Sequence, residues 1–451
     1  MDGLIEVKLE KDLLSNELEY FFTFLCDRFE YAVELWIKEL EKKFNKKFKP
    51  IWILSSKQND LFKKENFIII NRLINKFPKE NVDSKLVCQE EPEDLNKYFS
   101  ESEFIKGLIE KLVRKQGRVF ILPWTSSCLK AQNPQAIILG PGPDVAKKYD
   151  NKITQVELFN ELGLLRNKVQ IYNNFKELKK NVKFPSFISA SYTSGGFENG
   201  VINSKDKLDE YYTRVREENK GGKFISARLI EDVKHSPNVN AIVFEEGKTE
   251  IICISDQILR GCKYLGNIYP SIIDKKSKKA IIETTKIVGN HLSKKGFKGV
   301  FGLDFIIDSR GNLYTIDLNP RRQGGYVCNI LMALPKVSLI ELELKLALNE
   351  KIKNIPSYED FQVDYVWAHL KLKPYYDFMK IVKITNKNRV DTPFLEIGKG
   401  FKTIFYPKGY RFFGGGVGYA IKSGNNYNKV KEDLIKDIEK ILSTHLDLYT
   451  I

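Results

Sequence analysis

The spacing of apolar residues divides the chain into segments of different type. Residues 16–47 carry apolar side chains at helical intervals, which predicts one or two amphipathic helices. Short continuous apolar runs, which are typical of buried strands, follow at 51–54, 67–70, 119–122 and 136–139. Because a helical segment at 103–115 lies among these runs, residues 1–150 are predicted to form an N-terminal α/β domain with a parallel sheet.

After residue 150 the pattern changes to helices mixed with strands that suit antiparallel hairpins. Helices are predicted at 154–162, from an N-cap at Ser204, and at 279–293, and strands at 187–191, 224–226 and 241–244. Residues 151–350 are therefore predicted to form an α+β core. The remaining residues, 351–451, combine short strands with a closing helix at 426–442, which predicts a C-terminal α+β extension.

Composition narrows the class of protein. With 42% hydrophobic residues in 451, the chain can bury a core, which excludes a disordered or fibrous protein. The six cysteines and four histidines are dispersed without metal-ligand spacing, so a zinc enzyme or a histidine-based triad has little support. The acidic start, Met1–Glu6, and the lack of any run near the length of a membrane span predict a cytoplasmic protein with no membrane partner.

One predicted hairpin carries two acidic residues that should face each other. If residues 309–312 form its turn, residue 308 faces 313, and Asp304 then lies directly opposite Asp317. Asn319 shares this face because side chains two apart point the same way, whereas Ile316 and Leu318 point the other way. Facing carboxylates repel each other, but a hard cation such as Mg²⁺ would make the pair favourable.

A surface hairpin with solvated acids is the alternative for this pair. Two features argue against it: apolar neighbours flank Asp317 and Asn319, and the strand is followed by Pro320 and two arginines that could reach an anion. Asp308 is different, since beside Ser309 and Gly311 it is most simply a turn residue.

The hairpin residues carry a specific resemblance. Gly302-Leu303-Asp304-Phe305 followed by Ile316-Asp317-Leu318-Asn319-Pro320-Arg321 resembles the metal-binding hairpin of the ATP-grasp superfamily. The similarity extends over about residues 150–345, and the segments near 255–271 look closest to pheganomycin-type peptide ligases, in which an extra α/β domain precedes the grasp core. The resemblance implies a pre-ATP-grasp domain over 1–150, a core with a mobile lid around 184–226, and an extension that completes the active site.

The same resemblance implies roles for individual residues. Asp304, Asp317 and Asn319 would hold Mg²⁺, with Mn²⁺ as an alternative, and Lys152 would touch the phosphates of ATP. Ser194, Gly195 and Gly196 would form the phosphate lid, where glycines let backbone N–H groups approach oxygens; an ordinary glycine-rich hairpin loop is the alternative. The adenine-binding linker would be Arg228, Leu229, Ile230 and Glu231, with Glu231 accepting from the ribose; an edge strand with a surface acid is the alternative. Arg321, and more weakly Arg260, would act on the acyl phosphate or substrate carboxylate.

One position departs from the family pattern. The strand before the lid usually carries a lysine, and here Ser189 stands in its place, with Lys183 as a nearby substitute. The resemblance implies an ATP-dependent ligase that joins a small-molecule or peptide carboxylate to an amine through an acyl phosphate, releasing ADP and phosphate. Because of Ser189, a non-catalytic ATP-binding protein with a regulatory or partner-binding role is the alternative.

The charge distribution bears on partners. The formal net charge of +15 divides into +1 for residues 1–150, +8 for 151–350 and +6 for 351–451. The surplus therefore lies where a nucleotide and an anionic acyl donor are expected to bind, and it favours these small anions over nucleic acid as the partner. A homodimer is compatible with these features.

Overall fold

The computed structural model describes residues 4–11, 13–15, 18–25, 33–55, 66–71, 86–88, 91–164, 167–191, 199–215, 222–326, 337–372, 380–384, 402–405, 411–413 and 418–450. The chain forms two compact units. One comprises Met1–Pro143 together with Tyr326–Ile451, and the other comprises Asp144–Gly325.

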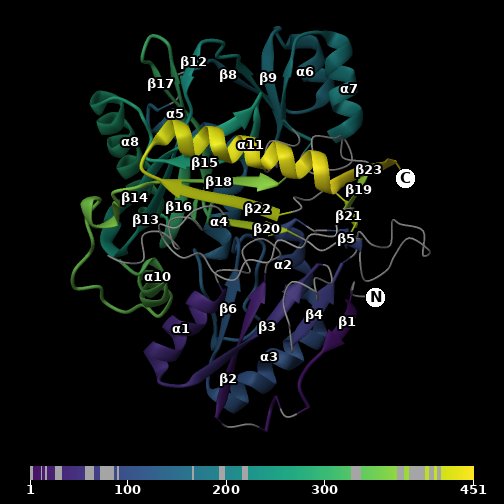
Figure 1. Ribbon diagram of the computed structural model, residues 1–451, viewed down its shortest axis with the longest axis vertical. Helices are drawn as coiled ribbons and strands as arrows, with labels where there is room; N and C mark the ends of the chain where they lie inside the picture. The colour runs from purple at the N-terminus through teal and green to yellow at the C-terminus, as the bar shows by residue number, and fades with distance from the viewer. Residues whose placement is uncertain are drawn as a thin grey trace. The chain divides into compact units, whose positions relative to one another are not determined.

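The N-terminal part of the first unit is an α/β sheet with helices on it (Figure 1). Its six strands lie in the order β1-β4-β3-β2-β6-β7, and all neighbours are parallel except β1 and β4. The strands are β1 (Leu4–Lys8), β2 (Glu19–Leu25), β3 (Lys47–Leu54), β4 (Phe67–Ile70), β6 (Val119–Pro123) and β7 (Ala136–Ile138), and the helices are α1 (Val33–Phe44), α2 (Pro92–Glu101) and α3 (Glu103–Gln116). The predicted parallel sheet is confirmed.

The prediction of helix from residue 16 is wrong for its first half, because residues 19–25 form strand β2 at the centre of the sheet. Phe21, Phe22, Phe24 and Leu25 are all at most 1% exposed, so both faces of this strand are covered. A strand buried on both faces has an almost continuous apolar run, and such a run also satisfies helical spacing. Helix α1 begins only at Val33.

The C-terminal part of the first unit contains two further sets of strands. In one, β18 (Val366–Leu372), β22 (Gly418–Gly424) and β20 (Lys402–Phe405) pair antiparallel, beside helix α11 (Tyr427–His445). In the other, the order is β23-β19-β21-β5, from β23 (Leu446–Thr450), β19 (Lys380–Ile384), β21 (Arg411–Phe413) and β5 (Leu86–Cys88). Helix α10 (Leu339–Ala347) and the short helix η5 (Glu359–Phe361) precede them. The predicted α+β character of this region is confirmed.

The second unit opens with α4 (Pro143–Asp150) and α5 (Lys152–Glu161) and then forms a small α+β subdomain (Figure 1). Its four strands lie in the order β10-β9-β11-β8, from β8 (Val169–Tyr172), β9 (Ser186–Ala190), β10 (Asn199–Ile202) and β11 (Phe224–Arg228). Helices α6 (Phe175–Asn181) and α7 (Lys205–Val215) complete it. Its core includes Ile188 and Ala190, two residues apart on one face of β9, so Ser189 lies on the other face.

The larger sheet of the second unit carries the predicted hairpin. Strands β13 (Pro237–Val243), β14 (Thr249–Arg260) and β15 (Lys263–Tyr269) pair antiparallel in sequence order, with the short helix η4 (Glu245–Gly247) after β13. Strand β16 (Gly299–Asp308) pairs with β13, with β17 (Leu313–Asn319) and, near its end, with β12 (Val233–His235). Helix α8 (Lys275–Lys294) buries Ile281, Val288 and Leu292. Within the described part of the chain, no helix is both long enough and apolar enough to cross a membrane.

Candidate active site

Asp304 on β16 and Asp317 on β17 are direct cross-strand partners, which confirms the predicted facing pair. The turn does not have the predicted register, however, because Leu313 pairs with Ile307 instead of residue 308. The pairing shifts by one residue between Phe305–Thr315 and Asp304–Asp317, so Ile316 is an extra, bulged residue. The bulge restores the facing of the two acids. It also separates Ile316, which is 37% exposed, from Leu318, which is fully buried, although the two were predicted to share a face.

The acidic pair belongs to a row of polar residues that crosses four strands. Asn238 on β13 pairs with Asp304 on one side and with Ser255 on β14 on the other. The side-chain amide of Asn238 donates to Asp304 Oδ1. Asn319 lies two residues after Asp317, and its Nδ2 lies 3.4 Å from Asp304 Oδ2 and 3.5 Å from Asp317 Oδ2. Both carboxylates therefore meet one amide, on the face that the sequence predicted.

The surroundings of Asp304 oppose its ionisation. Burial, and next the facing Asp317 carboxylate, raise the pKa of Asp304 to about 6; the Asn238 hydrogen bond and the charges of Lys152 and Arg321 oppose this rise. A carboxylate that is costly to ionise beside a second carboxylate is a place where a cation would be stabilising. No group of three or more His, Cys, Asp or Glu side chains suited to a metal occurs among the residues that the structure describes. Two carboxylates and one amide are nevertheless a donor set that suits Mg²⁺, which also takes phosphate and water oxygens.

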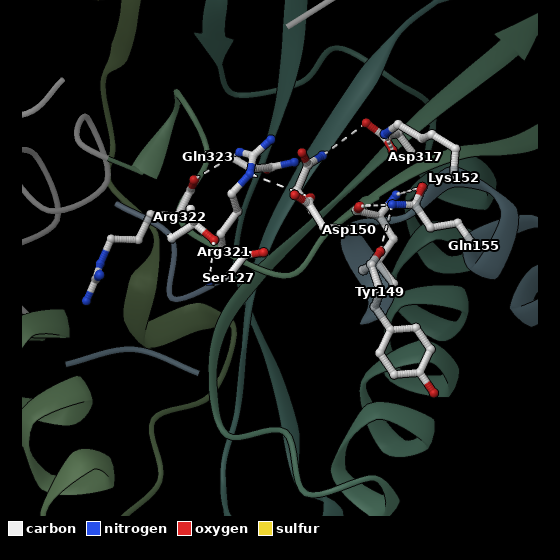
Figure 2. A network of polar contacts seen from close by, with 12 residues as sticks. Ser127, Tyr149, Asp150, Lys152, Gln155, Asp317, Arg321, Arg322 and Gln323 are labelled. Carbon is white, nitrogen blue, oxygen red and sulfur yellow. Dashed lines mark hydrogen bonds and ion pairs between the residues drawn. The ribbon is translucent and has the colours of Figure 1, made fainter. Parts of the chain in front are cut away.

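Lys152, at the start of α5, forms an ion pair with Asp317 (Figure 2). The local sequence places it there: Asn151 caps the helix by accepting from Ile153 N at 2.9 Å and Thr154 N at 3.3 Å. One turn further along α5, the buried side-chain amide of Gln155 hydrogen-bonds to the backbone of β17, as the backbone of a neighbouring strand would. Its Nε2 donates to Leu318 O at 2.6 Å, and its Oε1 accepts from Leu318 N at 3.2 Å. Gln155 thus docks α5 beside Asp317.

Arg321 follows the strand directly and lies on the same side as this pair. Its Nε is 3.9 Å from Asp150 Oδ1, and its Nη1 donates to Arg322 O at 3.3 Å (Figure 2). Because its charge acts on Asp304, the structure brings Arg321 into the same cluster as the two acids. Arg260 is exposed at the end of β14, five residues beyond Ser255, roughly 16 Å along the strand. The structure does not place Arg260 in this row of residues.

Asp308 is the turn residue that the sequence predicts. Its carboxylate is 2% exposed and accepts from the backbone N–H groups of Arg310 at 3.0 Å and Asn312 at 2.9 Å, and from the Tyr314 hydroxyl at 3.1 Å. These hydrogen bonds, that from the Asn312 side chain above all, lower the pKa of Asp308 to about 2. Its bonds are satisfied within the turn, so it is not part of the acidic pair.

The predicted phosphate lid, Ser194, Gly195 and Gly196, lies outside the described residues. Ser189, on the strand before it, is 7% exposed, and its hydroxyl donates to Ala190 O at 3.3 Å. On the same face, Ser189 has Ile225 and Asn199 as cross-strand neighbours. Lys183 is exposed and precedes β9.

The predicted adenine linker connects two sheets. Arg228 ends β11, and Leu229, Ile230 and Glu231 form an irregular segment before β12. The Arg228 N–H donates to Lys168 O at 2.9 Å. Within the described ranges, the backbone groups of residues 229–231 form no hydrogen bonds with other protein groups. This segment is therefore neither an edge strand nor paired, and it leaves backbone donors and acceptors for a ligand.

Three polar residues near the acidic pair were missed by sequence reasoning: Gln155, Asn238 and Gln323. Each is at most 5% exposed and hydrogen-bonded to the hairpin or to its acids. A signal existed for Asn238, because Asn238 and Asn240 alternate with apolar residues in an otherwise apolar strand. No local pattern marked Gln155, since its partner Leu318 is 163 residues away.

Comparison with known proteins bears on the family and the fold. Residues 165–319 match the family model described as "L-aspartate--L-methionine ligase, ATP grasp". Among structures, a biotin carboxylase from Campylobacter jejuni superposes with a TM-score of 0.64 at 15% identity, covering 99% of this chain and 93% of the other. The chain has the three-domain ATP-grasp fold. The ATP-grasp fold class predicted from the sequence is thereby confirmed.

Two further relatives extend the comparison. The biotin carboxylase domain of a Hydrogenobacter thermophilus 2-oxoglutarate carboxylase, crystallised with MgADP, has a TM-score of 0.62 at 16% identity and covers 95% of this chain and 90% of that one. An L-propargylglycine--L-glutamate ligase from Streptantibioticus cattleyicolor is 27% identical over 100 residues, 22% of this chain and 20% of the relative. The alignments span about a fifth of the length of such curated relatives.

Proposed function

We propose that this ATP-grasp protein is an ATP-dependent ligase that joins a carboxylate to an amine. The observation that carries the proposal is the facing pair Asp304–Asp317 with Asn319 between them, flanked by the cations of Lys152 and Arg321. Phosphoryl transfer from ATP depends mainly on positioning and on neutralising charge, and this cluster supplies both signs of charge in one place.

The metal that this fold uses would be held by Asp304, Asp317 and Asn319, with Mg²⁺ as the first candidate and Mn²⁺ as the alternative. When bound, it would neutralise charge on the phosphate oxygens of ATP and act as a Lewis acid. The residues fit such an ion because Asp304 is half-buried beside a second carboxylate, where a divalent cation removes the repulsion between the two acids.

Lys152 and Arg321 provide the remaining positive charge. Lys152 has a flexible ammonium that can leave Asp317 for a phosphate oxygen, because both partners are partly exposed, at 15% and 24%. Arg321 offers paired N–H donors for an acyl phosphate, and its guanidinium would stabilise the charge that develops there. Arg260 remains a weaker candidate for the substrate carboxylate.

The chemistry follows from these positions. A substrate carboxylate oxygen attacks the γ-phosphorus, the bond to the β–γ bridging oxygen breaks, and ADP leaves. An amine nitrogen then attacks the acyl carbon, the C–O bond to phosphate breaks, and the amine releases a proton as the C–N bond forms. The unpaired backbone of residues 229–231 is available for adenine, and Glu231 is exposed and available for the ribose.

An amino acid is the substrate class we favour for the carboxylate and the amine. The family model and the Streptantibioticus relative are both described as ligases of two amino acids, which supports this choice. The test is ADP release by the purified protein with Mg²⁺, ATP and a pool of amino acids and dipeptides, followed by mass spectrometry for new amides. Phosphate release that requires no carboxylate would contradict the ligase assignment.

A non-catalytic ATP-binding role is the second candidate, and Ser189 favours it, because a hydroxyl cannot neutralise phosphate charge as a lysine does. The same assay separates the two. A protein of this second kind would bind ATP with Mg²⁺ yet release no ADP with any carboxylate in the pool. Ser189→Lys offers a further test, since restored cationic charge should tighten ATP binding if this face of β9 meets the phosphates.

A further inference from the structure

The side chain of Gln323, four residues after the end of β17, packs directly against Gly302. A Cβ at Gly302 would lie 1.9 Å from both Cδ and Oε1 of the Gln323 side chain. Gly302 is the cross-strand partner of Asn319 and lies two residues before Asp304. The absence of a side chain at 302 therefore makes the space in which the Gln323 carboxamide lies, next to the acidic pair.

The orientation of this carboxamide is fixed by its neighbours. Asn238 Nδ2 donates to Gln323 Oε1 at 2.9 Å as well as to Asp304 Oδ1, and Gln323 Nε2 lies 3.4 Å from the same carboxylate oxygen. Asn240 Nδ2 in turn donates to Asn238 Oδ1 at 3.2 Å. Because the oxygen of Asn238 is used by Asn240, its nitrogen is directed at Asp304 and Gln323. Asn238, Asn240 and Gln323 thus form a buried network in which each amide has one orientation of its donor and acceptor.

Gly324, the next residue, also packs closely against the sheet. A Cβ at Gly324 would lie 2.4 Å from the Tyr264 hydroxyl, which donates to Asn267, and Asn267 Nδ2 donates to Ser255 Oγ at 3.0 Å. The segment that begins with Arg321 is thus held on the sheet at two successive positions. Among the described residues, the polar contacts of the Arg321 side chain are long, at 3.9 Å and 3.3 Å, so its place depends on how this segment is held.

We propose that Gln323, seated on Gly302 and oriented by Asn238, is a positioning residue that ties the Asp304 carboxylate to the segment carrying Arg321. This inference rests on the proposed function, because it assigns to Gln323 the alignment of a metal-holding acid with the arginine that meets the acyl phosphate. Side chains that orient metal ligands from behind typically change metal affinity or activity by about 10- to 100-fold when removed.

The experiment compares Gln323→Ala, Gly302→Ala and the double variant, with Gly107→Ala, whose new Cβ meets nothing within 4 Å, as the control. The readout is Mn²⁺ affinity measured by electron paramagnetic resonance with a non-hydrolysable ATP analogue present, so that no co-substrate is needed. We expect about 10- to 100-fold weaker Mn²⁺ binding in each single variant. Because the added methyl at 302 acts by displacing Gln323, the double variant should bind no worse than Gln323→Ala alone.

Two outcomes would overturn the inference: wild-type Mn²⁺ affinity in Gln323→Ala, or losses that multiply in the double variant. Analogue affinity measured without metal should stay unchanged, whereas a general disturbance of the fold would lower it too. Asp317→Asn, measured in parallel, separates the two levels. If Asp317→Asn binds Mn²⁺ normally, the proposed metal site itself fails; if it does not and Gln323→Ala does, only the positioning role fails.

Discussion

Lys152 of α5 and Asp317 of β17 form an ion pair although 165 residues separate them in the chain. The neighbouring acid, Asp304, has no such ion pair among the described residues; it accepts a hydrogen bond from the Asn238 amide, and its pKa is raised to about 6. One carboxylate is thus balanced by a cation, whereas the other is costly to ionise and is still largely ionised at pH 7. A divalent cation bound between the two carboxylates would remove the cost of ionising Asp304 and could take the place of Lys152 beside Asp317.

Asp317→Asn should abolish Mg²⁺-dependent ADP formation, with a loss larger than the 10- to 100-fold typical of residues behind a metal ligand. The variant removes a ligand charge and frees Lys152, while the side chain keeps its size at a partly exposed position. Steady-state ADP release against Mg²⁺ concentration measures this. Glu283→Gln, which changes an exposed carboxylate on α8, is the matched control and should behave as wild type.

Metal affinity should depend on pH through Asp304. Above about pH 7 the carboxylate is ionised and the apparent Mg²⁺ affinity should be constant; below pH 6 protons compete and affinity should fall by up to about tenfold per pH unit. Calorimetric Mg²⁺ titrations between pH 5 and pH 8 would show this change in the slope of affinity against pH.

The same shift predicts the pH dependence of stability. The folded-state pKa of Asp304 lies above the unfolded value, so between about pH 4 and 6 the native protein binds more protons than the unfolded chain. The contribution of Asp304 to the free energy of unfolding should therefore decrease as pH rises through this window. Comparing urea unfolding of wild type and Asp304→Asn across the window tests the sign. A pH dependence identical in the two proteins would remove Asp304 as its source.

Arg321→Ala should slow formation of the acyl phosphate by about 10²- to 10³-fold, the usual cost of losing one donor to developing charge. Arg321→Lys should recover only part of the rate, because an ammonium lacks the paired N–H geometry. Rapid-quench measurement of ADP formation checks this, and a rate equal to that of wild type in the alanine variant would exclude Arg321 from the site.

Gln155→Leu should lower the free energy of unfolding by about 1–3 kcal/mol, because the Leu318 N–H and C=O lose their partners at the buried outer edge of β17. It should also displace α5 and weaken the Lys152–Asp317 ion pair. Urea denaturation gives the first effect. Gln135, exposed just before β7, provides a control as Gln135→Leu, for which a change well under 1 kcal/mol is expected.

Asp308→Ala should lower the melting temperature without changing Mg²⁺ affinity, since among the described residues its carboxylate bonds only within the turn. Its pKa, lowered to about 2, gives the sign: its stabilising effect is present above about pH 4 and is lost as pH falls toward 2. Differential scanning calorimetry at pH 7 and at pH 3 measures both. Weakened Mg²⁺ binding in this variant would contradict the separation of Asp308 from the acidic pair.

Residues close together in sequence were predictable because their interactions are local. The turn role of Asp308, the cap at Ser204 and the buried runs of the parallel sheet depend on neighbours within a few positions, and the structure confirms them. Residues 19–25 were predicted as helix but form strand β2. An apolar run that is buried on both faces does not alternate with polar residues, so only its pairing with β3 and β6 identifies it as a strand.

The acidic hairpin shows both kinds of information. The sequence alone predicted that two acids and an amide share one face of a hairpin and that this hairpin resembles that of the ATP-grasp superfamily, because both depend on residues close together in the chain. Only the tertiary structure decided the bulge at Ile316, the ion pair of Asp317 with Lys152, and the seating of Gln323 between Asn238 and Gly302. These depend on strands and helices distant in sequence, and the burial that raises the pKa of Asp304 exists only after they have packed together.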